Sequence, residues 1–291
     1  MIDLDRYKEI LDTLSRNKTR SFLTGFGVFW GIFMLVSLLG GGKGLRELLS
    51  SNFKGFANNS GVLITQNTTK PYDGLKKDRS WSLSYKDIER LKQQIPEVDV
   101  VTPLITKWGY TAVYGDQKVS CAFKGLDENY QEIETPELYY GRYLNNLDNL
   151  QKRKVCILGK KVYKTLFPKG GNPCGKEIRV GSVFFKVVGV DYNSGTMNAN
   201  GSTEESVVVP IGVMRDAYAM GDTINMLCFT GKPGIKVSDI VPKVRTVVAR
   251  AHHLDPTDEK AMPVINVEAI FGMMDSLFKG VDFLAWLVGI G

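Results

Sequence analysis

Residues 22–42 read FLTGFGVFWGIFMLVSLLGGG, a run of 21 uncharged and mostly apolar positions. A helix needs about 20 such residues to cross a membrane, because lipid offers no partners for backbone N–H and C=O groups. The run therefore predicts a transmembrane helix. A second apolar run, FLAWLVGIG, fills residues 283–291 and is expected to be the truncated start of a second transmembrane helix. Residues 43–282 between the two runs have the polar composition of a folded domain.

Basic residues predict the orientation of the first span. Arg16, Lys18 and Arg20 directly precede it, and short basic flanks stay in the cytoplasm. A cleaved signal peptide is the alternative, but its apolar core would have about 7 to 15 residues and end in small residues at a cleavage site. GGGKGL after the run is a poor cleavage site. We therefore expect an uncleaved anchor, with the N-terminus in the cytoplasm and the large domain outside.

Residues 1–21 have the periodicity of an amphipathic helix. Leu4, Tyr7, Leu11 and Leu14 recur at three- and four-residue steps, while charged residues occupy the other faces. Such a cytoplasmic helix would lie along the inner membrane surface. Packing on a cytoplasmic partner is the alternative, and the two placements are compatible.

Glycines in the first span suggest close packing with another helix. Gly27 and Gly31 form a GxxxG motif, and Gly25 extends the same small-residue region. In lipid, small residues allow helix backbones to approach closely, because no hydrophobic effect drives the helices together. The motif predicts a packing face without specifying a particular dimer.

Apolar stripes with helical spacing continue beyond both spans. Residues 43–57 predict an outgoing stalk helix, and residues 267–282 predict a returning one. Packed antiparallel, the two helices would hide their stripes against each other between the membrane and the outer domain. Either stripe alone would also suit the core of a globule. The stripe residues are Leu45, Leu48, Leu49, Phe53 and Phe56 on the outgoing helix, and Val267, Phe271, Met274, Phe278 and Val281 on the returning helix.

The outer region reads as two strand–helix–strand halves with an insert between them. The first half, residues 58–125, contains the strand pattern GVLITQ and the helix pattern SYKDIERLKQQI, which Ser84 and Asp87 open as a capping box. The second half, residues 215–266, repeats the strand–helix–strand order. Residues 126–214 form a β-rich insert with a hairpin at Gly181. This arrangement predicts an α+β fold.

Enzyme and metal patterns occur only as partial matches. GGNPCGK (170–176) fits the GxxxxGK spacing of a phosphate-binding loop, but Glu177 replaces the required Ser or Thr and a strand pattern follows. His252 and His253 lie near acidic residues, yet adjacent residues on a helix face different ways. We therefore assign no catalytic, cofactor-binding or metal-binding residue.

Charge and cysteine content narrow the class of protein further. The chain has 37 Lys+Arg and 31 Asp+Glu, a net charge of +6. This small, scattered excess is typical of a solvated surface, so no nucleic-acid partner is expected.

Cys121, Cys156 and Cys228 fit buried strand positions, whereas Cys174 lies in a turn pattern. The four cysteines match no CxxC spacing, and the sequence does not assign a disulfide.

Three segments resemble MacB/FtsX-type ABC transporter permeases. They are NKTRSFLTGFGVFWGI (17–32), ILGKKVYKTLFPKGGNPCGKEIRVGSVFFKVVGV (157–190) and SVVVPIGVM (206–214). The resemblance covers essentially the whole chain. It implies a permease of the bacterial inner membrane with four spans and a large periplasmic domain, in which a porter-like pair of βαβ units is interrupted by a smaller β-rich subdomain. Against that pattern, residues 1–291 are expected to lack a fused ATPase domain and the second to fourth spans.

The implied protein is a membrane-anchored, non-catalytic permease subunit. It would couple ATP hydrolysis by a separate cytoplasmic ABC ATPase subunit to periplasmic conformational change and export. Further expected partners are the lipid bilayer and a second permease copy or paralogue, with a periplasmic adaptor and an outer-membrane channel as additional candidates. Two alternatives stay open. One is an FtsX-like regulator of cell-wall hydrolases or a lipoprotein-extraction permease, and the other is a membrane-anchored sensory receptor.

Overall fold

The computed structural model describes residues 18–52, 55–193, 201–219 and 221–290. The chain divides into two compact units. A helical unit contains the residues up to Leu49 and from Met273 onward, and an outer domain contains Ser50–Gly272. Most of the predicted cytoplasmic helix, residues 1–17, lies outside the described residues.

The helical unit contains most of two long helices, namely α2 (Lys18–Asn52) and α8 (Val267–Ile290). Helix α2 runs without a break through the predicted border between span and stalk. Its segment Lys18–Leu45 is long and apolar enough, by length and composition, to cross a membrane. The two helices approach each other at Gly42, where an added Cβ would lie 3.4 Å from Cγ1 of Val281.

The glycines of the predicted packing face are open in this chain. A Cβ added at Gly25, Gly27 or Gly31 would meet no described atom within 4 Å. A further helix can therefore approach α2 there, and the packing role of these glycines stays a prediction.

The stripe predicted on the returning helix follows the less exposed face of α8. Phe278 is 4% exposed, and Phe271 and Met274 are half-buried, whereas Met273 and Leu277 are 72% and 56% exposed. The pairing of this stripe with the outgoing one stays a prediction. Phe53 and the side chain of Leu49 lie outside the described residues.

The prediction was wrong for Phe56, which is not part of a stalk helix. Helix α2 ends at Asn52, and Phe56 forms a β-bridge with Glu134. Gly55 has φ +88°, a left-handed conformation that a continuing helix does not contain. Phe56 is buried, so its apolar character serves the core of the outer domain.

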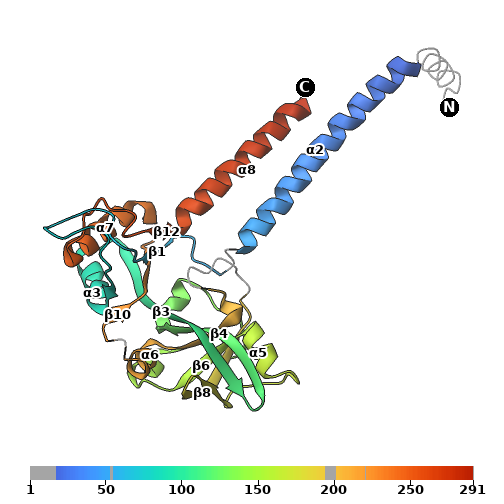
Figure 1. The fold of residues 1–291 in the computed structure, drawn as a ribbon. Helices are drawn as coiled ribbons and strands as arrows, with labels where there is room; N and C mark the ends of the chain where they lie inside the picture. Colours follow the sequence, from blue (N-terminus) through green and yellow to red (C-terminus); the bar gives the residue numbers. More distant parts are fainter. Residues whose placement is uncertain (1–17, 53–54, 194–200, 220, 291) are drawn as a thin grey trace. The chain divides into compact units, whose positions relative to one another are not determined.

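One ten-stranded sheet organises the outer domain (Figure 1). Its longest members, β3 and β4, form a hairpin that turns at Gly115 and Asp116. In spatial order the strands are β12 (Val264–Asn266), β1 (Ser60–Ile64), β11 (Met226–Gly231), β3 (Val98–Tyr114), β4 (Gln117–Leu126), β9 (Ser206–Pro210), β6 (Val155–Gly159), β8 (Val183–Asp191) and β5 (Leu138–Gly141), with β7 (Glu177–Val180) on β3 and β8. A separate pair joins β2 (Leu83–Ser84) to β10 (Thr223–Ile224).

The two predicted strand–helix–strand halves lie at one end of this sheet. Strand β1 is followed by α3 (Tyr85–Gln94) and β3, and β11 is followed by α7 (Val237–His252) and β12. Helix α7 packs against α3 and over β1, β11 and β12. The predicted capping box is present, because the Asp87 carboxylate accepts the backbone N–H of Ser84 at 2.8 Å.

The β-rich insert continues the same sheet. Strand β4 pairs in parallel with β9, and β6 pairs with both β9 and β8. Because β3 is 17 residues long, its far half also pairs with β7 of the insert. The structure is thus a mixed α+β fold, and the domain boundaries at residues 125 and 214 stay predictions. Short helices complete the insert, namely η1 (Glu128–Glu132), α4 (Asn146–Leu150), α5 (Lys160–Leu166), η2 (Thr203–Glu205) and α6 (Ile211–Ala217).

Candidate functional site

The chain is hydrogen-bonded to the outer domain within a few residues of the end of α2. Ala57 donates its backbone N–H to the carbonyl oxygen of Ile133 at 2.8 Å, and Thr135 donates to the carbonyl of Gly55 at 2.7 Å. A Cβ at Gly55 would lie 2.6 Å from Nδ2 of Asn193 and 3.0 Å from the carbonyl oxygen of Thr135, so glycine fits where other residues would clash. We call residues 55–57 and 133–135 the junction.

The side chain of Glu134 extends from the junction into a small buried cavity. Its carboxylate accepts hydrogen bonds from the hydroxyl groups of Thr203 at 2.8 Å and Tyr130 at 3.2 Å. Lys124 and Asp191 line the same cavity. We call Lys124, Glu134 and Asp191 the charged cluster.

Burial dominates ionisation in the charged cluster. Burial raises the pKa of Glu134 and of Asp191, and it lowers the pKa of Lys124, because a charge loses its hydration inside the protein. Attraction between Lys124 and the two carboxylates opposes these shifts without reversing them. The Nζ atom of Lys124 donates to the carbonyl oxygen of Gly201 at 2.8 Å. In the charged cluster next to the junction, attraction between opposite charges therefore does not fully offset their loss of hydration.

The returning helix is joined to the sheet more directly than the outgoing one, because α2 ends at Asn52 and β1 begins only at Ser60. Strand β12 ends at Asn266, and α8 begins at Val267 with no linker between them. Oδ1 of Asn266 accepts the backbone N–H of Ala269 at 3.1 Å, which caps the first turn. The Glu268 carboxylate accepts the backbone N–H of Ser238, at the start of α7, at 3.1 Å. Val267 is 1% exposed, so the helix starts inside the domain core.

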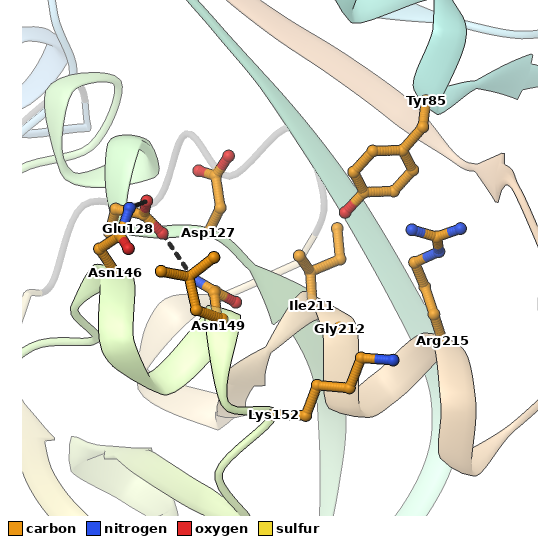
Figure 2. Close-up of a pocket in the computed structure, with 10 residues that line it drawn as sticks. Tyr85, Asp127, Glu128, Asn146, Asn149, Lys152, Ile211, Gly212 and Arg215 are labelled. Atoms are coloured by element: carbon orange, nitrogen blue, oxygen red, sulfur yellow. Dashed lines mark hydrogen bonds between the residues drawn. The ribbon is translucent and has the colours of Figure 1, made fainter.

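A cavity of about 360 Å³ opens at the ends of β4, α3, α4 and α6 (Figure 2). Asp127 and Glu128 lie at one side of the cavity, and Arg215 lies beside Tyr85. The remaining lining residues are Asn146, Asn149, Leu150, Lys152, Ile211 and Gly212. Apolar and charged groups therefore meet in one hollow of the outer domain.

The two basic residues of the cavity already have acidic partners. The guanidinium group of Arg215 lies 4.0 Å from the centre of the Tyr85 ring and pairs with Asp222 at 2.7 Å. The Nζ atom of Lys152 pairs with Asp216 at 2.5 Å. Burial raises the pKa of Tyr85 to about 12, so its hydroxyl stays protonated at neutral pH.

Asp127 and Glu128 lack such partners among the residues that the structure describes. Oδ1 of Asp127 accepts hydrogen bonds from the hydroxyl of Thr102 and the backbone N–H of Asn129. Burial raises the pKa of Asp127, and the negative charge of Glu128 raises it further. Neither carboxylate forms an ion pair within the described ranges, so this side of the cavity has a local excess of negative charge.

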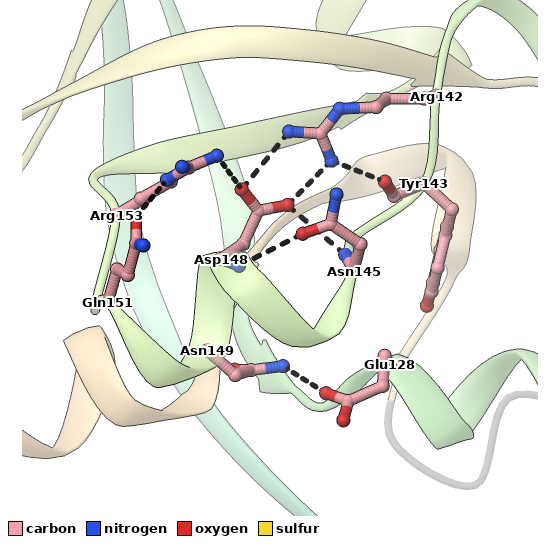
Figure 3. Close-up of polar contacts among 8 residues, drawn as sticks. All are labelled: Glu128, Arg142, Tyr143, Asn145, Asp148, Asn149, Gln151 and Arg153. Atoms are coloured by element: carbon pink, nitrogen blue, oxygen red, sulfur yellow. Dashed lines mark hydrogen bonds and ion pairs between the residues drawn. The ribbon is translucent and has the colours of Figure 1, made fainter.

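A buried carboxylate holds α4 at the edge of the cavity (Figure 3). Asp148 is fully buried and accepts two hydrogen bonds from Arg142, at 2.6 and 3.0 Å. It also accepts the backbone N–H of Asn145 at 3.1 Å. Burial raises the pKa of Asp148, but the bonds from Arg142 and Asn145 outweigh that effect and hold the pKa below its usual value.

The structure separates the residues that resembled catalytic or metal sites. Nε2 of His252 meets Asp87 at 2.8 Å, while Nδ1 of His253 meets Asp73 at 2.6 Å. Residues 170–176 connect α5 to β7, so the strand predicted after the GxxxxGK match is present. Within the described residues, no group of three or more His, Cys, Asp or Glu side chains could hold a metal ion.

The cysteines lie where their sequence patterns placed them. Cys121, Cys156 and Cys228 are buried in strands, and Cys174 is half-buried in the turn before β7. All four are free.

Sequence reasoning missed the charged cluster and the cavity. The one available signal was Lys124, a charge within the otherwise apolar strand pattern CAFKGL.

The chain matches a family of periplasmic domains. A family model described as the MacB-like periplasmic core domain matches residues 21–247. A curated relative, the macrolide export ATP-binding/permease protein MacB of Psychrobacter arcticus, is 28% identical over 188 residues, which is 64% of this chain and 28% of the relative. The protein of the same name from Aggregatibacter actinomycetemcomitans is 24% identical over 98% of this chain and 44% of its own length. The chain thus spans less than half the length of these relatives.

Solved structures show the same fold. The periplasmic region of MacB from Actinobacillus actinomycetemcomitans superimposes with a TM-score of 0.60 at 19% identity, covering 77% of this chain and 96% of that structure. The extracellular domain of the noncanonic ABC-type transporter YknZ from Gram-positive bacteria gives a TM-score of 0.57 at 19% identity, covering 72% of this chain and all of that domain.

Proposed function

Since the chain belongs to the MacB-like periplasmic core domain family, we propose that it is the permease part of an ABC transporter that transmits movement between the membrane and its outer domain. ATP hydrolysis in the cytoplasm would move α2 and α8, and the outer domain would respond by expelling a substrate. A macrolide is the first substrate to test, because the curated relatives are named for macrolide export.

One observation carries this proposal, namely the short connection of both long helices to the outer domain. The chain leaving α2 is hydrogen-bonded at the junction within a few residues, and α8 follows β12 without a linker. A flexible linker would absorb a displacement of either helix. A short, hydrogen-bonded connection instead passes the displacement to the residues it contacts.

We further propose the membrane placement and the partners that this function requires. The first span would cross the bacterial inner membrane with its N-terminus in the cytoplasm. A cytoplasmic ABC ATPase subunit would supply the energy, and a second permease copy or a paralogue would complete the transporter. The curated relatives combine ATP-binding and permease functions under one name, so co-purification of a separate ATPase with this chain is the direct test of that partner.

A glycine pair tests transmission through the junction. Gly55→Ala adds a Cβ that clashes with Asn193 and Thr135, whereas Gly74→Ala adds one with no neighbour within 4 Å. Both glycines have positive φ, +88° and +75°, so the backbone strain is matched. In the complete transporter reconstituted in vesicles, Gly55→Ala should lower macrolide export per ATP hydrolysed, and Gly74→Ala should leave that ratio unchanged. If the unaltered transporter shows no ATP-dependent export, a macrolide is not its substrate. If export per ATP is equal in the two variants, the junction does not transmit the movement.

The stalk offers a second matched pair. Phe278 is buried and its neighbour Leu277 is exposed, although the two are adjacent on α8. Phe278→Asp would place a charge on the protected face, while Leu277→Asp would place it in solvent. We expect Phe278→Asp alone to uncouple ATP hydrolysis from export. Equal coupling in the two variants would show that the protected face of α8 is not part of a lever.

A further inference from the structure

The cavity of Figure 2 has no part in the transmission pathway described above. It lies at the ends of α3, α4 and α6 within the outer domain, and neither the junction nor the first turn of α8 lines it. Its volume of about 360 Å³ is within the range of sites for small molecules. Its chemistry can therefore be considered independently of the proposed function.

Charge in the cavity is unbalanced on one side. Arg215 and Lys152 are paired with Asp222 and Asp216, whereas Asp127 and Glu128 have no basic partner among the described residues. Oδ1 of Asp127 is occupied by its bonds to Thr102 and Asn129, and Oδ2 makes no hydrogen bond within the described ranges. A positive group entering the cavity would find an available carboxylate oxygen, while an anion would meet two like charges.

An unsatisfied acceptor lies next to these carboxylates. Asn149 donates its Nδ2 to Glu128 at 2.6 Å, but its buried Oδ1 has no hydrogen-bond partner. A buried acceptor without a donor costs about 1–3 kcal/mol, so native proteins rarely leave one unpaired. Asp127, Glu128 and Asn149 all line the same cavity, so a ligand bound there would lie beside all three residues.

The remaining wall is suited to an apolar body. The ring of Tyr85 and the side chains of Ile211 and Leu150 line the cavity beside the acidic side, and Leu150 is 71% exposed at its rim. We propose that this cavity binds a small organic cation, with a primary ammonium group against Asp127 and Glu128 and an apolar body against Tyr85, Ile211 and Leu150.

Benzylammonium is a suitable probe, since it combines one ammonium group with one aromatic ring. Its binding to the purified full chain is measured by calorimetric titration at pH 7, beside benzyl alcohol and benzoate, which keep the ring and change the charge. We expect benzylammonium to bind at least about tenfold more tightly than either, which corresponds to about 1.4 kcal/mol. Absence of benzylammonium binding, or equal binding of benzyl alcohol, would overturn the proposal.

Three variants assign the binding to this cavity. Asp127→Asn and Glu128→Gln remove charge while retaining hydrogen-bonding groups, and Gly212→Leu fills the cavity. A Cβ at Gly212 makes ordinary contacts of 3.5 Å with Asn149 and Lys152, so this variant is expected to fold. Each should weaken benzylammonium binding about tenfold or more, with an unchanged melting temperature for Gly212→Leu. Asp116→Asn, in the exposed turn between β3 and β4, is the control and should not weaken binding. Unchanged binding in Gly212→Leu would place the ligand elsewhere and overturn the proposal, whatever the outcome of the transport assays.

Discussion

Glu134 and Asp148 are both buried carboxylates of the outer domain, yet their pKa values shift in opposite directions. Asp148 receives two hydrogen bonds from Arg142, which offset the loss of hydration. Among the described residues, Glu134 receives hydrogen bonds from neutral groups, while Lys124 gives its hydrogen bond to the carbonyl of Gly201. Burial alone therefore does not decide the direction in which the pKa of an acid shifts. Direct contact with a positive charge does.

The two carboxylates also differ in what they support. Asp148 fixes α4 beside the cavity, and its strong bonds are typical of a rigid anchor. Glu134 lies in the segment after η1 that forms the junction, where the nearby charges compensate one another less completely. We expect the region around Glu134 to respond more strongly to the loss of a single charge.

Removal of Lys124 should have the largest effect. Lys124→Met leaves Glu134 and Asp191 buried without a positive charge, and the loss of one partner from a buried charged group costs about 3–5 kcal/mol. The free energy of unfolding is measured by urea titration of the detergent-solubilised full chain at pH 7. Lys118→Met, at an exposed position of the same strand, is the control and should change little. Equal losses in the two variants would show that Lys124 does not stabilise the cluster.

Asp148→Asn should have an intermediate effect. The amide retains one acceptor but loses the charge that binds Arg142, and a hydrogen bond to a charged group contributes about 1.5–3 kcal/mol. We expect a loss of about 2 kcal/mol at pH 7 in the same urea titration. If the loss of unfolding free energy were as large as that of Lys124→Met, the contrast between Asp148 as a rigid anchor and Glu134 at the junction would be wrong.

Acidification should separate the two carboxylates by the sign of its effect. The pKa of Asp148 lies below 3.8, so its ionisation stabilises the fold above that pH and the benefit disappears as pH falls through the lower folded value. The pKa of Glu134 lies above 4.5, so its ionisation costs stability near neutral pH and that cost disappears as pH falls toward 4.5. Relative to the unaltered chain, the stability of Glu134→Gln should therefore be highest near pH 7, and the stability of Asp148→Asn should be highest below pH 3.8. Melting temperatures across this pH range provide the measurement; parallel curves would contradict the assignment.

The smallest effect is expected at an exposed pair on the cavity rim. Lys152 and Asp216 are 56% and 58% exposed, and such pairs contribute about 0.2–1 kcal/mol. Asp216→Asn should shift the urea midpoint only slightly, and added salt should reduce the shift. A loss comparable to that of Asp148→Asn would mean that burial is not what distinguishes the pairs.

Local patterns in the sequence predicted much of the fold. The capping box at Ser84 and Asp87 and the strand pattern GVLITQ depend on residues that are close in the sequence, so periodicity and turn chemistry identify them. Phe56 was misassigned because its spacing fits the stripe on α2, whereas Gly55 and the pairing with Glu134 determine its place. Spacing cannot reveal a partner that lies far away in the chain.

The charged cluster and the cavity were not predictable for the same reason. Lys124 meets Glu134 and Asp191 only after β4, the junction and the end of β8 have come together. Asp127 and Arg215, on opposite sides of the insert, come to line one cavity because β4 pairs in parallel with β9, which leads into α6. In a single sequence these residues resemble ordinary surface charges. Tertiary pairing determines their role.

The register of β1 has a consequence for synthesis. Ser60 pairs with Thr230 and Ile64 with Met226, and the other edge of β1 pairs with β12, which ends at Asn266. The strand nearest to the first span must therefore wait for nearly the whole outer domain before either of its edges is covered. Until then, its unpaired edges can pair with other extended chains. A ribosome that stalled before residue 226 would leave the nascent chain in this aggregation-prone state.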